Sequence, residues 1–514
     1  MRILFVNPIV RYHDEPRHAP LGILQLLAVL ERDHPKVKFQ LYDANAHRVD
    51  DYAHGGMRGL ESALRSDDYD VVAIGGLITA YNYIKQAVKT CKRIQPDAKI
   101  VAGGGFFTSM PTEMMRLLPE IYCGIVGEAY STLPELLKMV EAREEPSHVN
   151  GVAYRSNGEA SFTEPRKLIP DLDWLPFPAY KYAPLEIYFK HSGILMSDEA
   201  MRSKKRLDAC MSLGCPFLCK FCWDLGITSN VVQTGRPGGK TLFRHHSAGY
   251  IGRYIEHLRS SFVDIEPEGI PVDFIAWFDE NIVAHDAQTG FTWLKSVEEE
   301  LWRRGLVADC IKKGVPHNSE ECTGPHFGGT SHAGLIRKET LKTLKRIGFV
   351  YLDYGLESFS LDILKGLGKG ATPETNKRAV RWTQEAGIAP IPNQIIMFPD
   401  ETWRTIGEML DAWEETGIVS KPFVCTAYPG SEWFVKYRGF ILEQYGGSLD
   451  SFLEDLEDAT KVSALLTDRF TPAEAVGIQN ILAEAAKMGD YKGARRLLAL
   501  SVKKPVHAAS SKDF

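Results

Sequence analysis

Short apolar runs alternate with helix-like segments along most of this chain of 514 residues. In residues 1–145, each run of buried-strand type is followed by a stretch with helical spacing, as 20–32 follows 2–8. Alternation at this pitch predicts an α/β domain with a doubly wound, Rossmann-like parallel sheet. The strands we expect lie at 2–8, 36–45, 68–77, 98–105 and 123–128.

A second series of strand-like runs begins at about residue 206, with helical segments between most of them. A sixfold repeat of strand and helix predicts an open, partial (β/α)6 TIM barrel. The chemistry of such a barrel lies where strands end and loops begin. The expected strands are 206–214, 271–281, 307–314, 349–358, 389–398 and 421–428.

The length of the chain allows two or three domains. We expect a first domain at 1–145, a linker rich in proline and aromatic residues at 146–205, the barrel at 206–431 and a helical C-terminal region at 432–514.

Three cysteines, Cys215, Cys219 and Cys222, follow the first barrel strand with the spacing C-x3-C-x2-C. Three thiolates on one loop can hold three irons of a [4Fe–4S] cluster and leave the fourth iron open to a small molecule. A structural zinc site usually has four ligands, often as two C-x2-C pairs, and a second pair is missing here. Cys210 is better explained as a small packed side chain. The trio therefore predicts a catalytic cluster.

The composition excludes several classes of partner. Hydrophobic residues make up 44% and charged residues 25% of the chain, as in an ordinary globular protein. A net charge of −6 disfavours nucleic acid as a partner. The first residues, MRILFVNPIV, are too short an apolar run for a signal peptide, and no later run is long enough to span a membrane. We expect a cytoplasmic protein without membrane contact.

The cysteine spacing, with Phe221 just before the last cysteine, resembles the signature of radical S-adenosylmethionine (radical SAM) enzymes. Upstream, the runs PLGILQLLAVLE, LYDAN, VVAIGGL, IVAGGG and GIVGEAYSTLPELL are similar to the cobalamin-binding domain of the cobalamin-dependent (class B) members. The resemblance covers roughly 2–182 and 206–431. It implies three cofactors: a [4Fe–4S] cluster, S-adenosylmethionine (SAM) and cobalamin.

Ligands of doubly wound sheets bind at the carboxyl ends of the strands, where glycines let the backbone approach a large flat ligand. A G-x-G-x-x-G motif is missing after the first strand, which disfavours a dinucleotide. The resemblance makes the residues at these strand ends candidates for binding cobalamin: Asn7, Asp43, Thr79, Gly103, Gly104, Gly105, Gly127 and Glu128.

Many cobalamin proteins carry a D-x-H-x-x-G motif whose histidine binds cobalt from below. This chain reads NPIVRYHDEPRHAPLG at that place, and neither His13 nor His18 fits the motif. The resemblance therefore implies cobalamin without a histidine beneath it. Cobalt ligation by His13 is the alternative, and a solvated loop histidine is the favoured reading.

In the barrel, FDEN, GLES, FPDET and YPGSE resemble the recurrent motifs across which the family places SAM. Asp279 and Glu280 can receive an ammonium group, and Glu357 can accept hydrogen bonds from ribose hydroxyls or an amine. Gln394 marks the end of the fifth strand. Taken singly, each carboxylate is equally well explained as a helix cap or turn residue.

Two stretches, 224–270 and 315–335, fit the family poorly. The second contains four metal-ligand types, at His317, Cys322, His326 and His332, in no standard zinc spacing. Long loops at this end of a barrel are more often binding loops, so we expect 315–335 to contact substrate.

The resemblance implies a methyltransferase in which a 5′-deoxyadenosyl radical activates an unreactive carbon and methylcobalamin supplies the methyl group. Its expected partners are a small-molecule substrate and an external electron donor such as a flavodoxin or ferredoxin. Two alternatives stay open. One uses the same cofactors for ring formation, rearrangement or oxidation. The other is a corrinoid-carrying or zinc-stabilised binding protein that does not cleave SAM.

Overall fold

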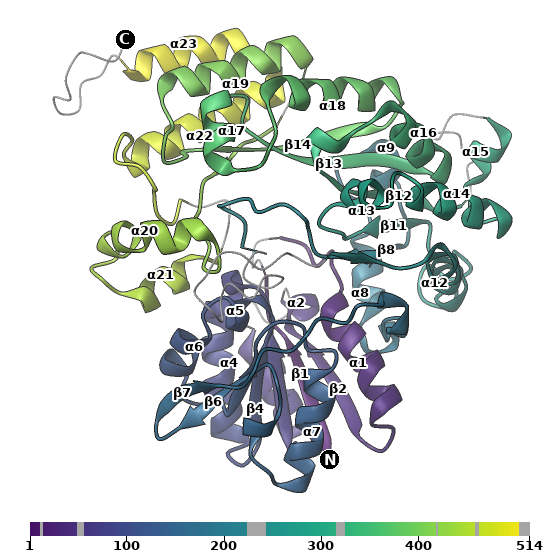
Figure 1. Ribbon diagram of the computed structural model, residues 1–514, viewed down its shortest axis with the longest axis vertical. Helices are drawn as coiled ribbons and strands as arrows, with labels where there is room; N and C mark the ends of the chain where they lie inside the picture. The colour runs from purple at the N-terminus through teal and green to yellow at the C-terminus, as the bar shows by residue number, and fades with distance from the viewer. Residues whose placement is uncertain are drawn as a thin grey trace.

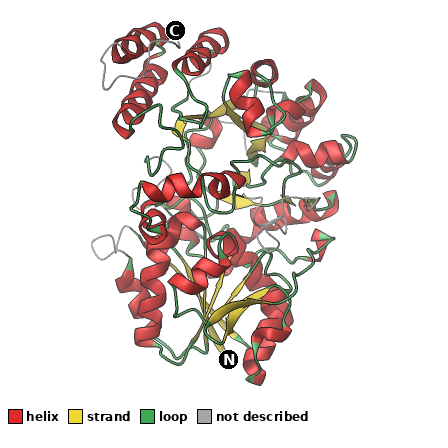
Figure 2. Cartoon of the chain, turned by 60° about the vertical axis from the view of Figure 1, so that its left-hand side comes forward, coloured by secondary structure: helices red, strands yellow, loops and turns green. Residues whose placement is uncertain are grey.

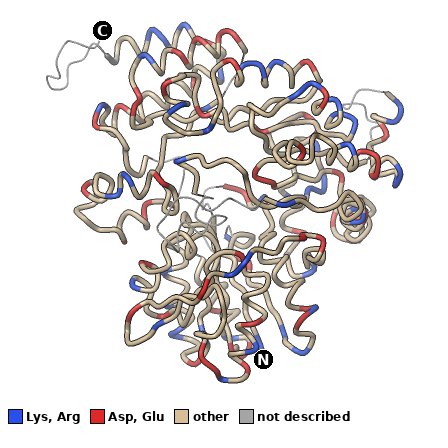
Figure 3. Tube along the Cα trace, viewed as in Figure 1, with Lys and Arg blue, Asp and Glu red and all other residues tan. Residues whose placement is uncertain are grey.

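The computed structural model describes residues 1–10, 14–48, 56–223, 243–314, 324–417, 420–457 and 462–502. Two sheets with helices packed on them form the two larger parts of the molecule, and further helices follow at the C-terminal end (Figure 1; Figure 2). Lys and Arg are interspersed with Asp and Glu along both parts (Figure 3). Within the described ranges, no helix is long and apolar enough to cross a membrane.

The first sheet has seven strands in the order β2-β1-β3-β4-β5-β6-β7. The first five are parallel, and β6 and β7 extend the sheet as an antiparallel pair from within 146–205. The predicted Rossmann-like domain is thereby confirmed. The strands are β1 Arg2–Asn7, β2 Lys38–Asp43, β3 Val71–Gly75, β4 Lys99–Gly103, β5 Cys123–Ile125, β6 Val152–Ser156 and β7 Glu159–Phe162.

Helices cover both faces of this sheet because its central strands are apolar on both sides. In β1, Ile3 and Phe5 pack into one core with α1 and α7, whereas Leu4 and Val6 pack into the other with α3 and α4. The helical segments up to the barrel are α1 Leu21–Asp33, α2 Ala44–His47, α3 Met57–Arg65, η2 Ile78–Ala80, α4 Tyr81–Ile94, α5 Gly104–Thr108, α6 Pro111–Leu117, α7 Thr132–Ala142, η3 Pro146–His148, η4 Leu172–Trp174, η5 Tyr180–Tyr182, α8 Leu185–Lys190 and α9 Asp198–Met201.

The second sheet has six parallel strands in the order β15-β14-β13-β12-β11-β8, so each strand pairs with the next one of the series. Because β8 and β15 are its two edges, the barrel is open, as predicted. Its strands are β8 Arg206–Ala209, β11 Phe274–Trp277, β12 His326–Ser331, β13 Phe349–Glu357, β14 Ala389–Ile396 and β15 Phe423–Val424. A separate antiparallel pair consists of β9 Ser212–Leu213 and β10 Arg244–His245.

The helices of the barrel and the C-terminal region complete the chain, and the predicted C-terminal helices are confirmed. They are α12 Ala248–Ser261, α13 Ile282–Gln288, α14 Trp293–Arg303, α15 Asp309–Lys313, η6 Ala333–Leu335, α16 Lys338–Ile347, α17 Leu361–Leu367, α18 Pro373–Glu385, α19 Trp403–Thr416, α20 Glu432–Glu443, α21 Leu449–Asp455, α22 Pro472–Met488 and α23 Tyr491–Val502.

The prediction of the third barrel strand was wrong. Residues 307–314 contain helix α15, and the strand is β12, which lies inside the stretch 315–335 expected as a binding loop. Two glycines weaken the strand pattern in β12. The structure requires them, because a Cβ at Gly328 would lie 2.1 Å from the Tyr351 ring and one at Gly329 would lie 2.3 Å from Ile282 Cδ1.

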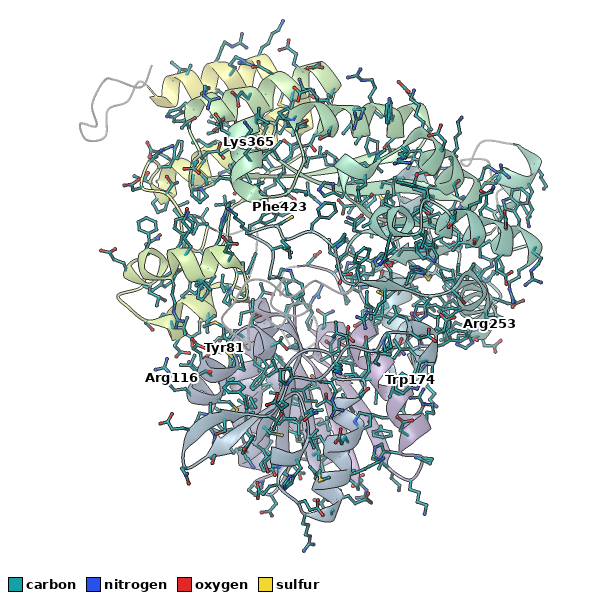
Figure 4. The ribbon with its side chains drawn as sticks, in the orientation of Figure 1. Tyr81, Arg116, Trp174, Arg253, Lys365 and Phe423 are labelled. Carbon is teal, nitrogen blue, oxygen red and sulfur yellow. The ribbon has the colours of Figure 1, made fainter. Side chains whose placement is uncertain are left out.

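The carboxyl ends of the first sheet point toward the barrel, since α2 and α5 start directly after β2 and β4 and lie on that side (Figure 1). Side chains connect the two parts. Tyr188 Oη donates to Asp43 Oδ2 over 2.6 Å, and His18 Nδ1 lies 2.8 Å from Asp208 Oδ2. On α4, Tyr81 Oη donates to Asp450 Oδ1 of α21 over 2.6 Å (Figure 4).

Candidate functional site

The three cysteines lie on the loop that follows β8 and β9, at the carboxyl end of the barrel. All three are thiols; Cys219 is buried, and Cys215 and Cys222 are half-buried. Lys220, in the middle of the loop, fixes it by two backbone hydrogen bonds. Its N–H donates to Leu367 O at the end of α17, and its carbonyl accepts from Trp433 N at the start of α20, both over 3.0 Å. The loop is therefore held from two sides.

Aromatic side chains of the cysteine loop pack against the barrel. Phe221 contacts Trp433 with ring centroids 6.1 Å apart, and Phe217 stacks on His332 at 4.0 Å with an interplanar angle of 9°. His332 Nδ1 accepts from Gly334 N over 3.0 Å, so Nε2 carries the proton and donates to Lys369 O over 3.0 Å. Burial, followed by the charge of Lys369, lowers the pKa of His332 to about 4.

His332 therefore supports the cysteine loop with both ring nitrogens hydrogen-bonded, and substrate contact by the stretch 315–335 stays a prediction. His326 is buried on β12, with Nε2 3.8 Å from Cys310 Sγ. His317 and Cys322 lie outside the described residues.

Next to Cys219 lies a buried ion pair. Lys369 Nζ is 2.6 Å from Glu357 Oε1, each side chain is 8% exposed, and Lys369 also donates to Gly355 O. Lys369 follows Gly368, where a Cβ would lie 3.8 Å from Leu218 O of the cysteine loop. Burial raises the pKa of the Cys219 thiol, the charge of Lys369 lowers it and the charge of Glu357 raises it. Glu357 has a left-handed backbone with φ of 60°. The predicted ligand Glu357 thus holds Lys369 under the cysteine loop.

The carboxylates of the FDEN motif hold the segment that leads into the cysteine loop. Asp279 is buried and accepts hydrogen bonds from Ser212 Oγ and, over 3.3 Å, from Met211 N. The exposed Glu280 accepts from Gly214 N over 3.2 Å through Oε2. Burial raises the pKa of Asp279 to about 7, although its hydrogen bonds lower it.

This pKa predicts a pH dependence of stability. The ordinary value for Asp279 is 3.8, so between about pH 4 and 7 the folded state keeps a proton that the unfolded state has lost. The free energy of unfolding therefore falls as the pH rises through this window, by at most about 1.4 kcal/mol per pH unit. Asp279→Asn removes the titrating carboxyl group. We therefore expect the free energy of unfolding of the variant, minus that of the unmodified protein, to increase from pH 4 to 7 when both are measured by urea denaturation. If this difference in free energy of unfolding did not change with pH, the raised pKa assigned to Asp279 would be contradicted.

Gln394 faces the helices that cover the barrel: it is fully buried, and its Oε1 accepts from Trp413 Nε1 of α19 over 2.8 Å. Its neighbour Asn393 is on the opposite face of β14 and donates through Nδ2 to Asp353 Oδ1 over 2.6 Å. Asp353 shares the inner face of β13 with Glu357, and burial raises its pKa to about 7. Sequence analysis missed Asp353 and Asn393, although the period of two along β13 is a signal that links Asp353 to Glu357.

In the first domain, three of the candidate side chains bind protein partners. Asn7 Nδ2 donates to Asp43 Oδ1 over 2.7 Å, and burial raises the pKa of Asp43. Glu128 forms an ion pair with Arg244, in which Arg244 Nη1 lies 3.1 Å from Glu128 Oε2. These contacts fix the strand ends and connect the first domain to the cysteine side of the barrel.

The glycine candidates form an open edge. A Cβ added at Gly103 or Gly127 would meet nothing within 4 Å, whereas one at Gly104, where φ is 77°, would lie 2.9 Å from Gly76 N and O. Gly105 is buried in α5, and Thr79 is half-buried in η2. A backbone edge without side chains at the ends of β4 and β5 fits a large flat ligand.

Residues 9–137 match the B12 binding domain, and residues 298–412 match the radical SAM superfamily. The chain therefore combines a B12-binding domain with a radical SAM domain. It is 24% identical over 80% of its length to an uncharacterized methyltransferase of Pyrococcus horikoshii, of which it covers 77%. It is also 24% identical over 85% of its length to the anaerobic magnesium-protoporphyrin IX monomethyl ester cyclase of Cereibacter sphaeroides, of which it spans 64%.

Two solved structures share the fold of this chain. The radical SAM methyltransferase TsrM from Kitasatospora setae, with tryptophan and a SAM analogue bound, has a TM-score of 0.61 at 16% identity; the match covers 87% of this chain and 76% of TsrM. The cobalamin-dependent SAM radical enzyme OxsB has a TM-score of 0.59 at 18% identity, with 85% of this chain and 55% of OxsB covered.

These domains take cobalamin, a [4Fe–4S] cluster and SAM as cofactors. The residues present fit a cluster, because three thiols on one loop match the three protein ligands of a cluster with one open iron. In the described part of the chain, no three His, Cys, Asp or Glu side chains are grouped to hold one metal ion.

Proposed function

We propose that this protein is a C-methyltransferase that acts on an unreactive carbon of a small-molecule substrate. One observation carries the proposal: a loop with three thiols, fixed at the mouth of the barrel, lies beside the B12-binding domain. A Cβ at Gly430 would lie 3.1 Å from Ser109 Oγ, directly after α5, and 3.2 Å from Trp223 O at the end of the cysteine loop. The named methyltransferases among its relatives support it. When bound, the cofactors supply a carbon-centred radical and a transferable methyl group.

The residues of the chain have distinct roles in this proposal. Cys215, Cys219 and Cys222 are the iron ligands. The remaining carboxylate oxygen of Glu357 and the pair Asp353–Asn393 offer hydrogen bonds to the ribose or amine of SAM. The Phe217 ring, stacked on His332, and the Phe221 ring, tilted against Trp433, exclude water from the sides of the loop.

On the opposite side, Gly103 to Gly105, Gly127 and Thr79 contact cobalamin in our proposal. Cobalamin is bound without a histidine beneath the cobalt in this proposal; His18 Nδ1 lies 2.8 Å from Asp208 Oδ2, and His13 lies outside the described residues. Electrons are supplied by an external donor such as a flavodoxin or ferredoxin.

A second function has an observation in its favour. Three relatives are named anaerobic magnesium-protoporphyrin IX monomethyl ester cyclases, which favours ring formation as the second candidate function. The two functions differ in the fate of the methyl group of SAM. Methylation consumes it, whereas ring formation leaves it on methionine.

The test uses anaerobically reconstituted and reduced protein, supplied with cobalamin and with SAM that carries a deuterated methyl group. We expect it to form 5′-deoxyadenosine and to transfer the labelled methyl group from the sulfur of SAM to cobalamin. With a substrate, the product gains one labelled methyl group, measured by mass spectrometry. Formation of 5′-deoxyadenosine without any label transfer would favour ring formation. If SAM is not cleaved at all, both functions are wrong and a corrinoid-binding protein is left.

A further inference from the structure

Arg48 is a buried arginine at the carboxyl edge of the first sheet, directly after α2. Its side chain is fixed on one side, because Nη1 donates to Asn45 Oδ1 over 2.8 Å. Asn45 is in turn held by Val10 N, 3.3 Å from the same oxygen. Arg48 is only 2% exposed, and within the described residues its Nε and Nη2 are buried without a hydrogen-bond partner.

The two unpaired groups have a particular geometry. The N–H of Nε and one N–H of Nη2 lie on the same edge of a guanidinium, and this edge binds a carboxylate or phosphate side-on with two parallel hydrogen bonds. A buried charge whose hydrogen bonds are unmade costs several kcal/mol. Arg48 therefore presents a fixed, unfilled fork for an oxyanion.

Among the described residues, no acidic group is hydrogen-bonded to Nε or Nη2 of Arg48. Both oxygens of Asp43 are engaged: Oδ1 accepts from Asn7 Nδ2 and Ala46 N, and Oδ2 accepts from Tyr188 Oη. Burial lowers the pKa of Arg48, and the charges of Asp14 and Asp43 raise it only in part.

A second arginine lies close to the first. The charge of Arg17, on the loop after β1, contributes to lowering the pKa of Arg48. Arg17 Nη2 pairs with Glu15 Oε2 at 2.7 Å, while its Nε is buried and unpaired among the described residues. Arg17 thus offers a second buried N–H without a partner among the described residues, on the loop between β1 and α1, and its positive charge acts on Arg48.

This place lies between the two domains. Arg17 O accepts from Arg206 Nη1 of β8 over 3.2 Å, and Tyr188 of α8 covers the neighbouring Asp43. We propose that Arg48, assisted by Arg17, binds an oxyanion, either a carboxylate or a phosphate, at the junction of the cobalamin-binding domain and the barrel. Two sources have this chemistry: the phosphodiester in the nucleotide tail of cobalamin and an acidic group on the substrate. The site serves methylation and ring formation equally.

The test of the site uses the full chain without cofactors and inorganic phosphate as the probe. We expect phosphate to raise the thermal midpoint by at least about 2 °C over chloride at equal ionic strength, because a ligand of the folded state stabilises it. Arg48→Gln should lose this rise, and Arg17→Gln should weaken it. The control is Arg253→Gln, an exposed arginine on α12, which should keep it (Figure 4). The same response in Arg48→Gln as in the unmodified protein, or no response in either, overturns the proposal.

Corrinoid binding distinguishes the two sources. If the tail phosphate fills the fork, Arg48→Gln should weaken cobalamin binding about 10- to 100-fold and leave cobinamide, which lacks that phosphate, unchanged. If the substrate fills it, both corrinoids bind the variant normally, and phosphate still stabilises the cobalamin-loaded protein. Arg48→Lys keeps the charge without the fork and should resemble Arg48→Gln. If Arg48→Gln weakened the binding of cobalamin and cobinamide equally, and phosphate did not stabilise the unmodified protein, the role of Arg48 would be purely structural. None of these readouts requires SAM cleavage, so failure here is separate from failure of the proposed function.

Discussion

Replacing Cys219 with alanine is expected to remove the iron–sulfur cluster and abolish SAM cleavage. Its thiol is the most buried of the three on a loop that is hydrogen-bonded to both α17 and α20, so the backbone cannot easily bring another ligand into its place. Removing a residue that only hydrogen-bonds to a metal ligand costs about 10- to 100-fold in metal affinity or activity. Removing the ligand itself should therefore cost more than about 100-fold. Iron content, the visible spectrum and 5′-deoxyadenosine formation measure the effect.

Cys210 offers a matched control for this variant. It lies five positions before Cys215 in the same segment, and its Sγ donates to Ser212 O over 3.0 Å. Because it is outside the trio, Cys210→Ala should keep both iron and SAM cleavage. Cys215→Ala and Cys222→Ala should behave like Cys219→Ala. If Cys219→Ala retained its iron and its activity, the cluster would have other ligands.

The parts of the fold that could be predicted from the sequence depend on local patterns. The apolar runs of the first sheet and the helices between them are set by neighbouring residues, and so is the cysteine trio on its loop. The third barrel strand is different, because its two glycines are required by Tyr351 and Ile282, which approach it from other elements. A pattern read along the chain does not contain that requirement.

The candidate site shows the same limit. A carboxylate at a strand end is a plausible ligand in the sequence, but its partner decides its role, and that partner is distant along the chain. Asp43 is held by Tyr188, and Glu128 is paired with Arg244. Gln394 and Asn393 are adjacent, and only the strand register shows that Asn393 and not Gln394 lies on the inner face with Asp353.

Removing the positive charge of Lys369 is expected to destabilise the cofactor-free protein strongly. Lys369→Met leaves the buried carboxylate of Glu357 without its partner and removes the donor to Gly355 O. Breaking a buried ion pair from one side costs about 3–5 kcal/mol, because an uncompensated charge stays buried. Urea denaturation followed by tryptophan fluorescence measures the loss. Lys338, whose pair with Glu385 is 52% and 51% exposed, is the control: Lys338→Met should cost less than about 1 kcal/mol.

The double variant Lys369→Met/Glu357→Leu separates stability from function. An apolar pair in place of a buried ion pair is often neutral for stability, so most of the loss in Lys369→Met should be recovered when Glu357 is replaced as well. SAM cleavage should be lost in the double variant even where stability is recovered, because the variant lacks the Glu357 carboxylate that we assign to SAM. If the loss of stability in the double variant equalled the sum of the losses in the two single variants, Lys369 and Glu357 would not be energetically coupled. If the double variant instead cleaved SAM as well as the unmodified protein does, Glu357 would serve only to neutralise Lys369 beneath the cysteine loop.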